Sequence, residues 1–212
     1  MKTDELISLL AADPAPEPNT VTRRFTAALA FGIAGAFLLM LSTHGVRTDL
    51  AQATGEAMFW GKLIFAASLA FAALIATQRL GHPGVHLGGV RLALAAPVLV
   101  LWLVAILVLL VATPEQRSHL LLGDTWSTCA LSIAMISVPP FLAMLWALRG
   151  LAPTQLALAG ASSGLLAGSL STMMYALHCP ESGAPFIALW YVLGIAIPTL
   201  AGAMLGPRVL RW

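Results

Sequence analysis

The sequence predicts an all-α membrane protein, a bundle of six transmembrane helices with both the N- and the C-terminus in the cytoplasm. Three observations lead to this fold class. Hydrophobic residues make up 59% of the 212 residues and charged residues only 9%, a composition typical of polytopic membrane proteins. Six apolar segments are each long enough to cross a bilayer core of about 30 Å. Lys and Arg residues gather on one side of these segments.

Each apolar segment is interpreted as a helix, because backbone polar groups in hydrocarbon must form hydrogen bonds within their own segment. The segments cover residues of about 25–42, 58–77, 92–112, 126–148, 154–176 and 186–206. They form one transmembrane domain, residues 25–206, between a cytoplasmic N-terminal tail, residues 1–24, and a cytoplasmic C-terminus, residues 207–212. No connecting loop is longer than about 16 residues, so we expect no separate catalytic or ligand-binding domain.

The orientation follows from the distribution of basic residues. A cytoplasmic N-terminus places eight of them inside and two outside, which agrees with the positive-inside rule. The eight are Lys2, Arg23, Arg24, Arg79, Arg91, Arg149, Arg208 and Arg211, and the two are Arg47 and Arg117. The net charge of +2 is too small, and too scattered, to predict direct nucleic-acid binding.

The N-terminal tail predicts a short amphipathic helix over residues of about 3–12, followed by a Pro-rich linker over residues 13–18. Thr3 can cap this helix, and Asp4 and Glu5 lie in its first turn, where the helix dipole favours acidic groups. An apolar stripe follows, formed by Leu6, Ile7, Leu9 and Leu10. Because so short a helix is marginal in water, we favour docking on a partner protein. Packing on the bundle and contact with lipid headgroups are the alternatives.

Lys62 is the basic residue that lies well inside a predicted span, where a charge is costly. It is about one helical turn from the outer end of that span. We therefore expect its ammonium to reach the outer surface, with Glu56 as a neighbour, rather than to form part of an ion pathway.

The fourth and fifth segments contain two packing motifs. Pro139 and Pro140 remove backbone hydrogen bonds and predict a kink, which would be a fixed bend or a hinge. Glycines at every fourth position of the fifth segment predict a strip that another helix can approach closely. They are Gly160, Gly164 and Gly168. Packing inside the bundle is favoured, and a homodimer seam is the alternative.

Cys129 and Cys179 are the two cysteines of the chain, and both map to the outer end of the bundle, at shallow depth. In an oxidising compartment they could form a disulfide. Soft metals and oxidants are the natural reactants of a thiol pair, and His178 could add a third metal ligand. The alternatives are a purely structural disulfide, or two unrelated small apolar residues.

Catalysis is not expected, because the sequence has no zinc-protease, serine-hydrolase or phosphate-loop motif and no paired intramembrane carboxylates. No cofactor is predicted to be required. A small transporter or metal-handling protein is a second hypothesis, although matching halves and buried acidic residues are missing. A structural membrane subunit is the third, with its helices stapled by a disulfide.

Several motifs together resemble a known family. They are MKTDELISLL at residues 1–10, the pair Pro139 and Pro140, GASSGLLAG at residues 160–168, YALHCPES at residues 175–182, then Phe186, Trp190 and Tyr191, and LRW at residues 210–212. In this order and spacing, they are similar to the NrsF-type membrane anti-sigma factors. The resemblance extends over nearly the whole chain.

This resemblance implies a multi-pass protein of a bacterial inner membrane that holds an extracytoplasmic-function (ECF) sigma factor inactive. Its partners would be the sigma factor and the lipid bilayer. The tail would bind the sigma factor, and the family's two outer cysteines, which match Cys129 and Cys179, would sense heavy-metal or oxidative stress. A soft heavy-metal ion is then a signal rather than a cofactor.

Overall fold

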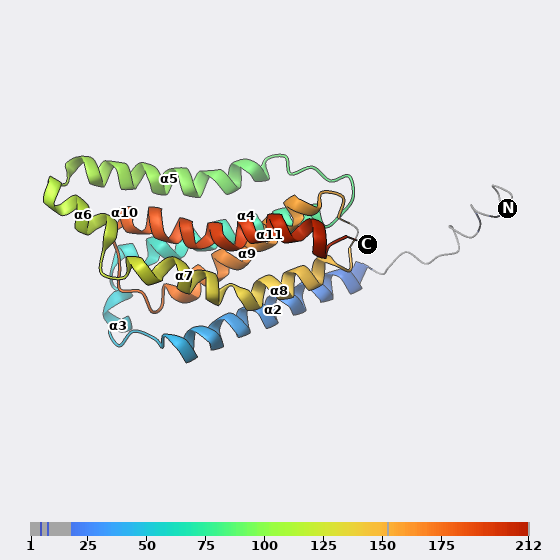
Figure 1. Ribbon diagram of the computed structural model, residues 1–212, viewed down its shortest axis with the longest axis horizontal. Helices are drawn as coiled ribbons and strands as arrows, with labels where there is room; N and C mark the ends of the chain where they lie inside the picture. The colour runs from blue at the N-terminus through green and yellow to red at the C-terminus, as the bar shows by residue number, and fades with distance from the viewer. Residues whose placement is uncertain (1–4, 6–7, 9–17, 152, 212) are drawn as a thin grey trace.

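The computed structural model describes residues 5, 8, 18–151 and 153–211, and these residues form helices, turns and loops without a strand. Six helices, or continuous runs of helix, are long and apolar enough to cross a membrane (Figure 1). The predicted all-α fold with six spans is therefore confirmed. The first three spans are α2 (Pro18–Thr43), α4 (Ala57–Leu80) and α5 (Val90–Val111).

The last three spans are less regular than the first three. The fourth combines α6 (Pro114–Leu122), α7 (Trp126–Ile136) and α8 (Val138–Leu148), and the fifth is α9 (Leu156–Tyr175). The sixth begins with α10 (Ala184–Phe186), passes through the π-helical turn η1 (Ile187–Tyr191) and continues as α11 (Val192–Val209). A further turn of helix, α3 (Leu50–Ala53), lies between the first two spans.

Two helix starts differ from the sequence prediction. α2 begins at Pro18, several residues before the apolar run, because proline is favoured in the first turn of a helix and hydrophobicity marks only the part in lipid. α6 occupies a segment that we expected to be a loop. Its first turn is stabilised by Gln116, whose side-chain oxygen accepts a hydrogen bond from the backbone N–H of Thr113 at 3.2 Å.

The fourth span is interrupted where the two prolines occur. α7 ends at Ile136 and α8 begins at Val138, with Ser137 between them. Pro139 and Pro140 pack against α2 at Gly35 and Gly32. A Cβ atom added at Gly32 would lie 2.8 Å from the Cα of Pro140, and one at Gly35 would lie 2.8 Å from the Cβ of Pro139. The bend is thus held tightly against the first span.

α9 lies in the middle of the bundle, in contact with α2, α4, α7, α8 and α11 (Figure 1). α5 lies along the edge and exposes most of its apolar side chains, among them Leu92, Leu103 and Leu110. Such an all-round apolar helix requires hydrocarbon on its open faces.

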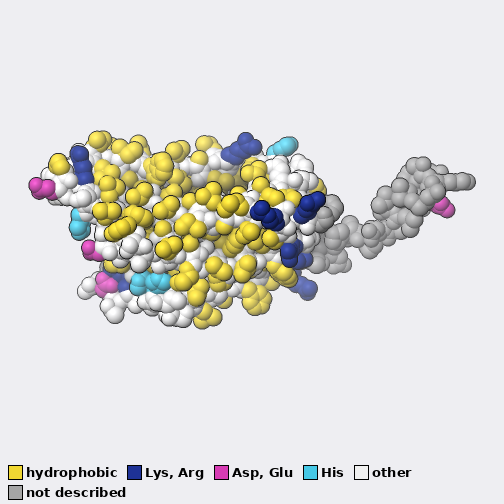
Figure 2. All heavy atoms as spheres, viewed as in Figure 1, with side chains coloured by type: hydrophobic (Ala, Val, Ile, Leu, Met, Phe, Trp, Pro, Cys, Tyr) yellow, Lys and Arg dark blue, Asp and Glu magenta, His cyan; other side chains and the backbone are white. Residues whose placement is uncertain are grey.

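The two ends of the bundle differ in charge, as Figure 2 shows on the face it displays. Most of the dark blue side chains gather at the end where the chain enters α2 and leaves α11, whereas the magenta side chains of the bundle lie at the opposite end, together with cyan side chains and a few dark blue atoms. We call the first the basic end; it contains Arg79, Arg91, Arg149 and Arg208 at the termini of their helices. We call the second the thiol end; both cysteines lie there, at the start of α7 and after α9.

Candidate functional site

The two cysteines meet at the thiol end although 50 residues separate them in the sequence. Cys129 lies in the first turns of α7, and Cys179 lies in the loop after α9, whose chain turns back as the N–H of Cys179 donates to the carbonyl of Tyr175 at 2.9 Å. Both are free thiols with 0% of their surface exposed, and their side chains lie close enough to influence each other electrostatically. The pair lies at one end of the bundle and is fully covered.

Two tyrosines enclose the thiols. Tyr175 closes α9, Tyr191 ends the π-helical turn η1, and their ring centroids are 6.2 Å apart. The Tyr175 hydroxyl lies beside Cys129, and the Tyr191 hydroxyl lies beside Cys179. Tyr191 is completely buried, and its hydroxyl makes no regular hydrogen bond within the described residues. π-helical turns often occur at functional sites, and here one directs a phenol at a thiol.

Lys62 is buried beside the same loop, with 1% of its surface exposed. Its ammonium donates to the carbonyl oxygen of Cys179 at 2.8 Å and to that of Glu181 at 3.1 Å. The expectation that this ammonium reaches the outer surface was therefore wrong, although Glu56 is one of the charged groups near it, as expected. The loop after α9 folds over the start of α4 and supplies the oxygen atoms that water would otherwise have supplied. We call Cys129, Cys179, Tyr175, Tyr191 and Lys62 the thiol cluster.

A carboxylate fastens the same loop to the start of the fourth span. Glu181 accepts a hydrogen bond through Oε1 from the backbone N–H of Asp124, at 2.8 Å. Gly123 has a φ of 54°, and a Cβ atom there would lie 2.8 Å from the Glu181 carboxyl group. Glycine is thus required twice at this position, by its backbone conformation and by the close approach. Thr125 also contacts the loop, with Oγ1 3.9 Å from the Cys179 sulfur.

Two histidines lie on the other side of the cluster. His44 shares a hydrogen bond of 2.8 Å between Nε2 and the Ser132 hydroxyl, and His178 has Nδ1 3.2 Å from the carbonyl oxygen of Gly45. Their ring centroids are 5.0 Å apart, and the His44 ring also meets Tyr175 edge to face. Burial, and secondly the nearby His178, lower the pKa of His44 below its usual value.

The predicted three-ligand metal site is not assembled. Among the residues that the structure describes, no three His, Cys, Asp or Glu side chains are grouped so that they could hold a metal ion. His178 turns toward His44 and Gly45 instead of joining both sulfur atoms, because its ring packs in the gap between the ends of α2 and α9. The two thiols remain the donors available to a soft ion.

The thiols differ in their electrostatic surroundings. Cys179 lies in the loop outside the spans, where the neighbouring Cys129 side chain lowers its pKa below the usual value, against the opposing effect of burial. The Tyr191 side chain and the Lys62 ammonium act in the same direction. The ammonium, which binds the carbonyl of the same residue, favours the thiolate, the form that reacts with metals and oxidants.

The glycine strip of α9 packs within the chain. A Cβ atom at Gly160 would overlap Gly202 of α11, one at Gly164 would overlap Pro198, and one at Gly168 would lie 3.0 Å from the Cα of Ile195. The small residues let two helix backbones touch, as the sequence led us to favour. With α11 covering it, this strip is not exposed for a second copy of the chain.

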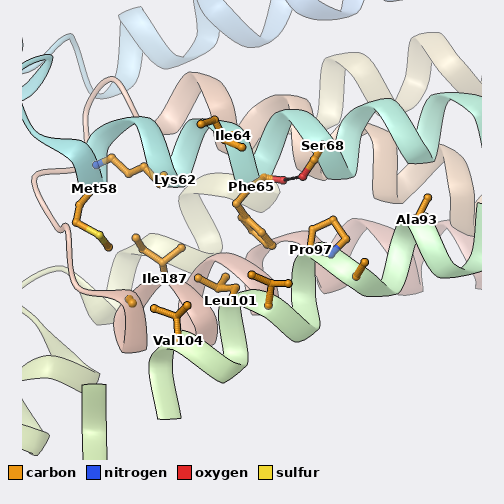
Figure 3. Close-up of a pocket in the computed structure, with 14 residues that line it drawn as sticks. Met58, Lys62, Ile64, Phe65, Ser68, Ala93, Pro97, Leu101, Val104 and Ile187 are labelled. Carbon is orange, nitrogen blue, oxygen red and sulfur yellow. Dashed lines mark hydrogen bonds between the residues drawn. The ribbon is translucent and has the colours of Figure 1, made fainter. Parts of the chain in front are cut away.

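A cavity of about 450 Å³ lies between α4 and α5 (Figure 3). Its lining is almost wholly apolar, and Ser68 uses its hydroxyl to donate to the carbonyl of Phe65. The Lys62 nitrogen is directed toward the start of α4, away from Pro97 and Leu101 on the facing helix (Figure 3). The cavity therefore offers no polar path of the kind that a transporter of ions needs.

The whole predicted apolar stripe of the tail, Leu6, Ile7, Leu9 and Leu10, lies outside the described residues, as does Asp4. Glu5 and Ser8 are described, and both are helical and exposed. The Ser8 hydroxyl donates to the Glu5 carbonyl at 2.9 Å.

Tyr175, Tyr191 and Ser132 were not identified from the sequence as parts of the site. Isolated aromatic and hydroxyl residues in apolar helices give no spacing signal, since most such residues serve packing alone. Lys62 did give a signal, as a charge inside a span, although its partners could not be read from it.

Comparison with known proteins agrees with this architecture. A family model described as "NrsF: Negative regulator of sigma F" matches residues 10–212. A protein of Azospira oryzae named "Probable anti-sigma-F factor NrsF" is 48% identical over 213 residues, and a protein of Caulobacter vibrioides named "Anti-sigma-F factor NrsF" is 38% identical over 220 residues. Each alignment covers 100% of both chains. No solved structure matches the chain.

Proposed function

Since the chain belongs to the NrsF family of negative regulators of sigma F, we propose that it is a membrane-embedded anti-sigma factor for an ECF sigma factor. The protein would reside in a bacterial inner membrane. Its cytoplasmic tail would hold the sigma factor inactive, and its thiol pair would release that hold under heavy-metal or oxidative stress. The full-length similarity to two anti-sigma-F factors is the observation that carries this proposal.

The proposed orientation has the basic end in the cytoplasm and the thiol end in the periplasm. The charge difference between the two ends of the bundle supports it, because Lys and Arg are retained on the cytoplasmic side. Both native cysteines are buried, so the test needs new ones. In a chain without native cysteines, Thr48→Cys at the thiol end should react with a membrane-impermeant maleimide in intact spheroplasts, and His86→Cys at the basic end should react only after lysis. The reverse pattern would exclude this orientation.

Sequestration would work by occlusion. The apolar stripe of the tail would occupy a groove on the sigma factor that the sigma factor needs for RNA polymerase, in the manner of an amphipathic helix in a groove. The tail is joined directly to α2, so a movement of the first span would reach it without any intervening domain.

The thiol pair would be the input. A soft divalent ion would displace one proton from each thiol and bind both sulfur atoms, whereas an oxidant would accept two electrons as the thiols lose two protons and form a disulfide. To move the occupancy of a two-state bundle from 1:99 to 99:1, the trigger must favour one state by about 5.5 kcal/mol. Binding of a metal ion by both sulfur atoms, or formation of a disulfide between them, would supply a free-energy difference of this size.

A continuous set of contacts connects this input to the tail. Cys129 is on α7, which continues through the break at Ser137 into α8. α8 contacts α2 at the prolines and again near its end, where Arg24 donates to the carbonyl oxygen of Trp146 at 2.8 Å. We propose that a shift of α7 tilts α8 and, through it, the span that carries the tail.

Co-purification with the sigma factor tests the output. Removal of residues 1–17 leaves α2 intact and should abolish recovery of the sigma factor. Leu9→Asp should do the same through the apolar stripe, while Ser8→Asp, which adds the same charge one residue away, should retain binding. Equal recovery of the sigma factor by the full-length and the truncated protein would contradict the proposal.

A further inference from the structure

Lys62 is the group in the thiol cluster to which neither the family nor the proposed function gives a role. An ammonium buried to this extent is costly unless its hydrogen bonds are satisfied, and the carbonyls of Cys179 and Glu181 satisfy two of its three N–H donors. In the part of the chain that the structure describes, no carboxylate forms an ion pair with it. Its hydrogen-bond acceptors are thus two backbone carbonyls of one loop.

The position of these two carbonyls matters, because one belongs to Cys179 itself and the other lies two residues after it. Cys179 and Glu181 both belong to the short loop between α9 and α10, and Lys62 reaches them from α4, more than 100 residues earlier in the sequence. The alkyl stem of Lys62 packs along α4, with the ring of Phe59 5.7 Å from the ammonium. Figure 3 shows the side chain extended toward the start of α4. This extension places the nitrogen at the end of α4 that the loop covers.

We propose that Lys62 is the positioning residue of the thiol pair: its ammonium clamps the Cys179–Glu181 backbone onto α4 and thereby holds the Cys179 sulfur next to Cys129. The proposal deepens the proposed function, since it concerns how the same thiol pair is kept ready for its trigger. Without the two donated hydrogen bonds, the Cys179–Glu181 backbone would lose its bonds to α4, while the loop would keep its contacts with Asp124 and Thr125 on the fourth span and the longer bond of 3.4 Å from the Ser182 hydroxyl to Glu56.

The clamp also explains why a lysine is tolerated inside a span. An apolar residue of similar length would fill the same space at lower cost in the membrane, but it would leave the buried Cys179 carbonyl and the partly buried Glu181 carbonyl without this donor. The second span is thereby tied to the loop that carries Cys179, so that movement of this loop bears on α4 as well as on α7.

Bridging of the two thiols by a trivalent arsenical measures their mutual position directly. One molecule of phenylarsine oxide reacts with two thiols, binds both sulfur atoms through arsenic and releases one water, without any change in oxidation state. The purified full-length protein in detergent is titrated, and intact mass reports the fraction with a single adduct that protects both cysteines from later alkylation.

Lys62→Met keeps the apolar stem and removes the donors, so the concentration of arsenical at half-bridging should rise at least tenfold. Thr77→Val is the matched control, because Thr77 is a buried polar residue near the other end of α4 whose hydroxyl bonds only within its own helix. This variant should bridge like the unaltered protein. Lys62→Arg should return the titration toward the unaltered protein, since a guanidinium can supply both donors.

Unchanged bridging in Lys62→Met would overturn the proposal, as would equal effects of Lys62→Met and Thr77→Val, or a Lys62→Arg variant no better than Lys62→Met. If Lys62→Met does not accumulate in membranes, Lys62→Gln replaces it. The glutamine side chain is shorter and uncharged, so it should hold the two carbonyls less firmly, and bridging weaker than in Lys62→Arg is expected. The titration needs no sigma factor. Failure of the tail to bind a sigma factor would therefore refute the proposed function and leave this result intact.

Discussion

Gly160 of α9 and Gly202 of α11 face each other so closely that a Cβ atom on either would overlap the carbonyl group of the other. Their contact brings the fifth and sixth spans together over the full length of the glycine strip. The thiol cluster depends on it, because Tyr175 extends from one of these helices and Tyr191 precedes the other.

Gly160→Leu should separate these two helices and lower the thermal midpoint of the detergent-solubilised protein. Overpacking against a backbone that cannot move aside costs about 1–3 kcal/mol or more. Gly61→Leu is the control, since a Cβ atom at Gly61 meets no other atom within 4 Å. Equal midpoints for the two variants would show that the contact can relax without cost.

Arg24→Met should weaken the attachment of α2 to α8. The Arg24 guanidinium donates to the Trp146 carbonyl and lies 4.4 Å from the centroid of its ring, interactions that together contribute about 1–2 kcal/mol. Arg23→Met removes the same charge from an exposed neighbour and should have little effect on the thermal midpoint. A smaller loss for Arg24→Met than for Arg23→Met would contradict this assignment.

Cys129→Ser and Cys179→Ser should each abolish induction of the sigma-dependent genes by a soft metal, measured with a transcriptional reporter. The double variant should behave like either single variant, because the two thiols act as one unit. Thr128→Ser, one residue before Cys129, is the control and should respond normally. A normal response from either cysteine variant would rule out sensing by the pair.

Acidification should destabilise the thiol end through His44. Because the pKa of His44 is lowered in the folded protein, the unfolded chain binds a proton first as the pH falls. The contribution of His44 to stability is complete above its usual pKa of about 6.5 and is lost as the pH falls from there toward the lower, folded value. The thermal midpoint should therefore drop between pH 7.5 and 5.5, and His44→Gln should reduce the drop. An identical drop in this variant would assign it to other groups.

The sequence was sufficient for the parts of the fold that depend on neighbouring residues. Apolar runs located the six spans, because in lipid each segment must satisfy its own backbone. The glycine spacing of α9 likewise indicates close packing, and the two prolines of the fourth span indicate a kink. The start of α2 at Pro18 and the helix α6 were not predicted, because both lie in polar segments where hydrophobicity does not indicate a span.

The thiol cluster could be anticipated only as two cysteines at one end of the bundle. Packing among four spans brings the two side chains close together, places Lys62 against the loop of Cys179, and puts Tyr175 and Tyr191 beside the sulfur atoms. Local sequence patterns record which face of a helix is apolar, but they do not record the rotation and height at which distant helices meet. Contacts between residues more than 100 positions apart, such as Lys62 and Cys179, exist only once the bundle has closed.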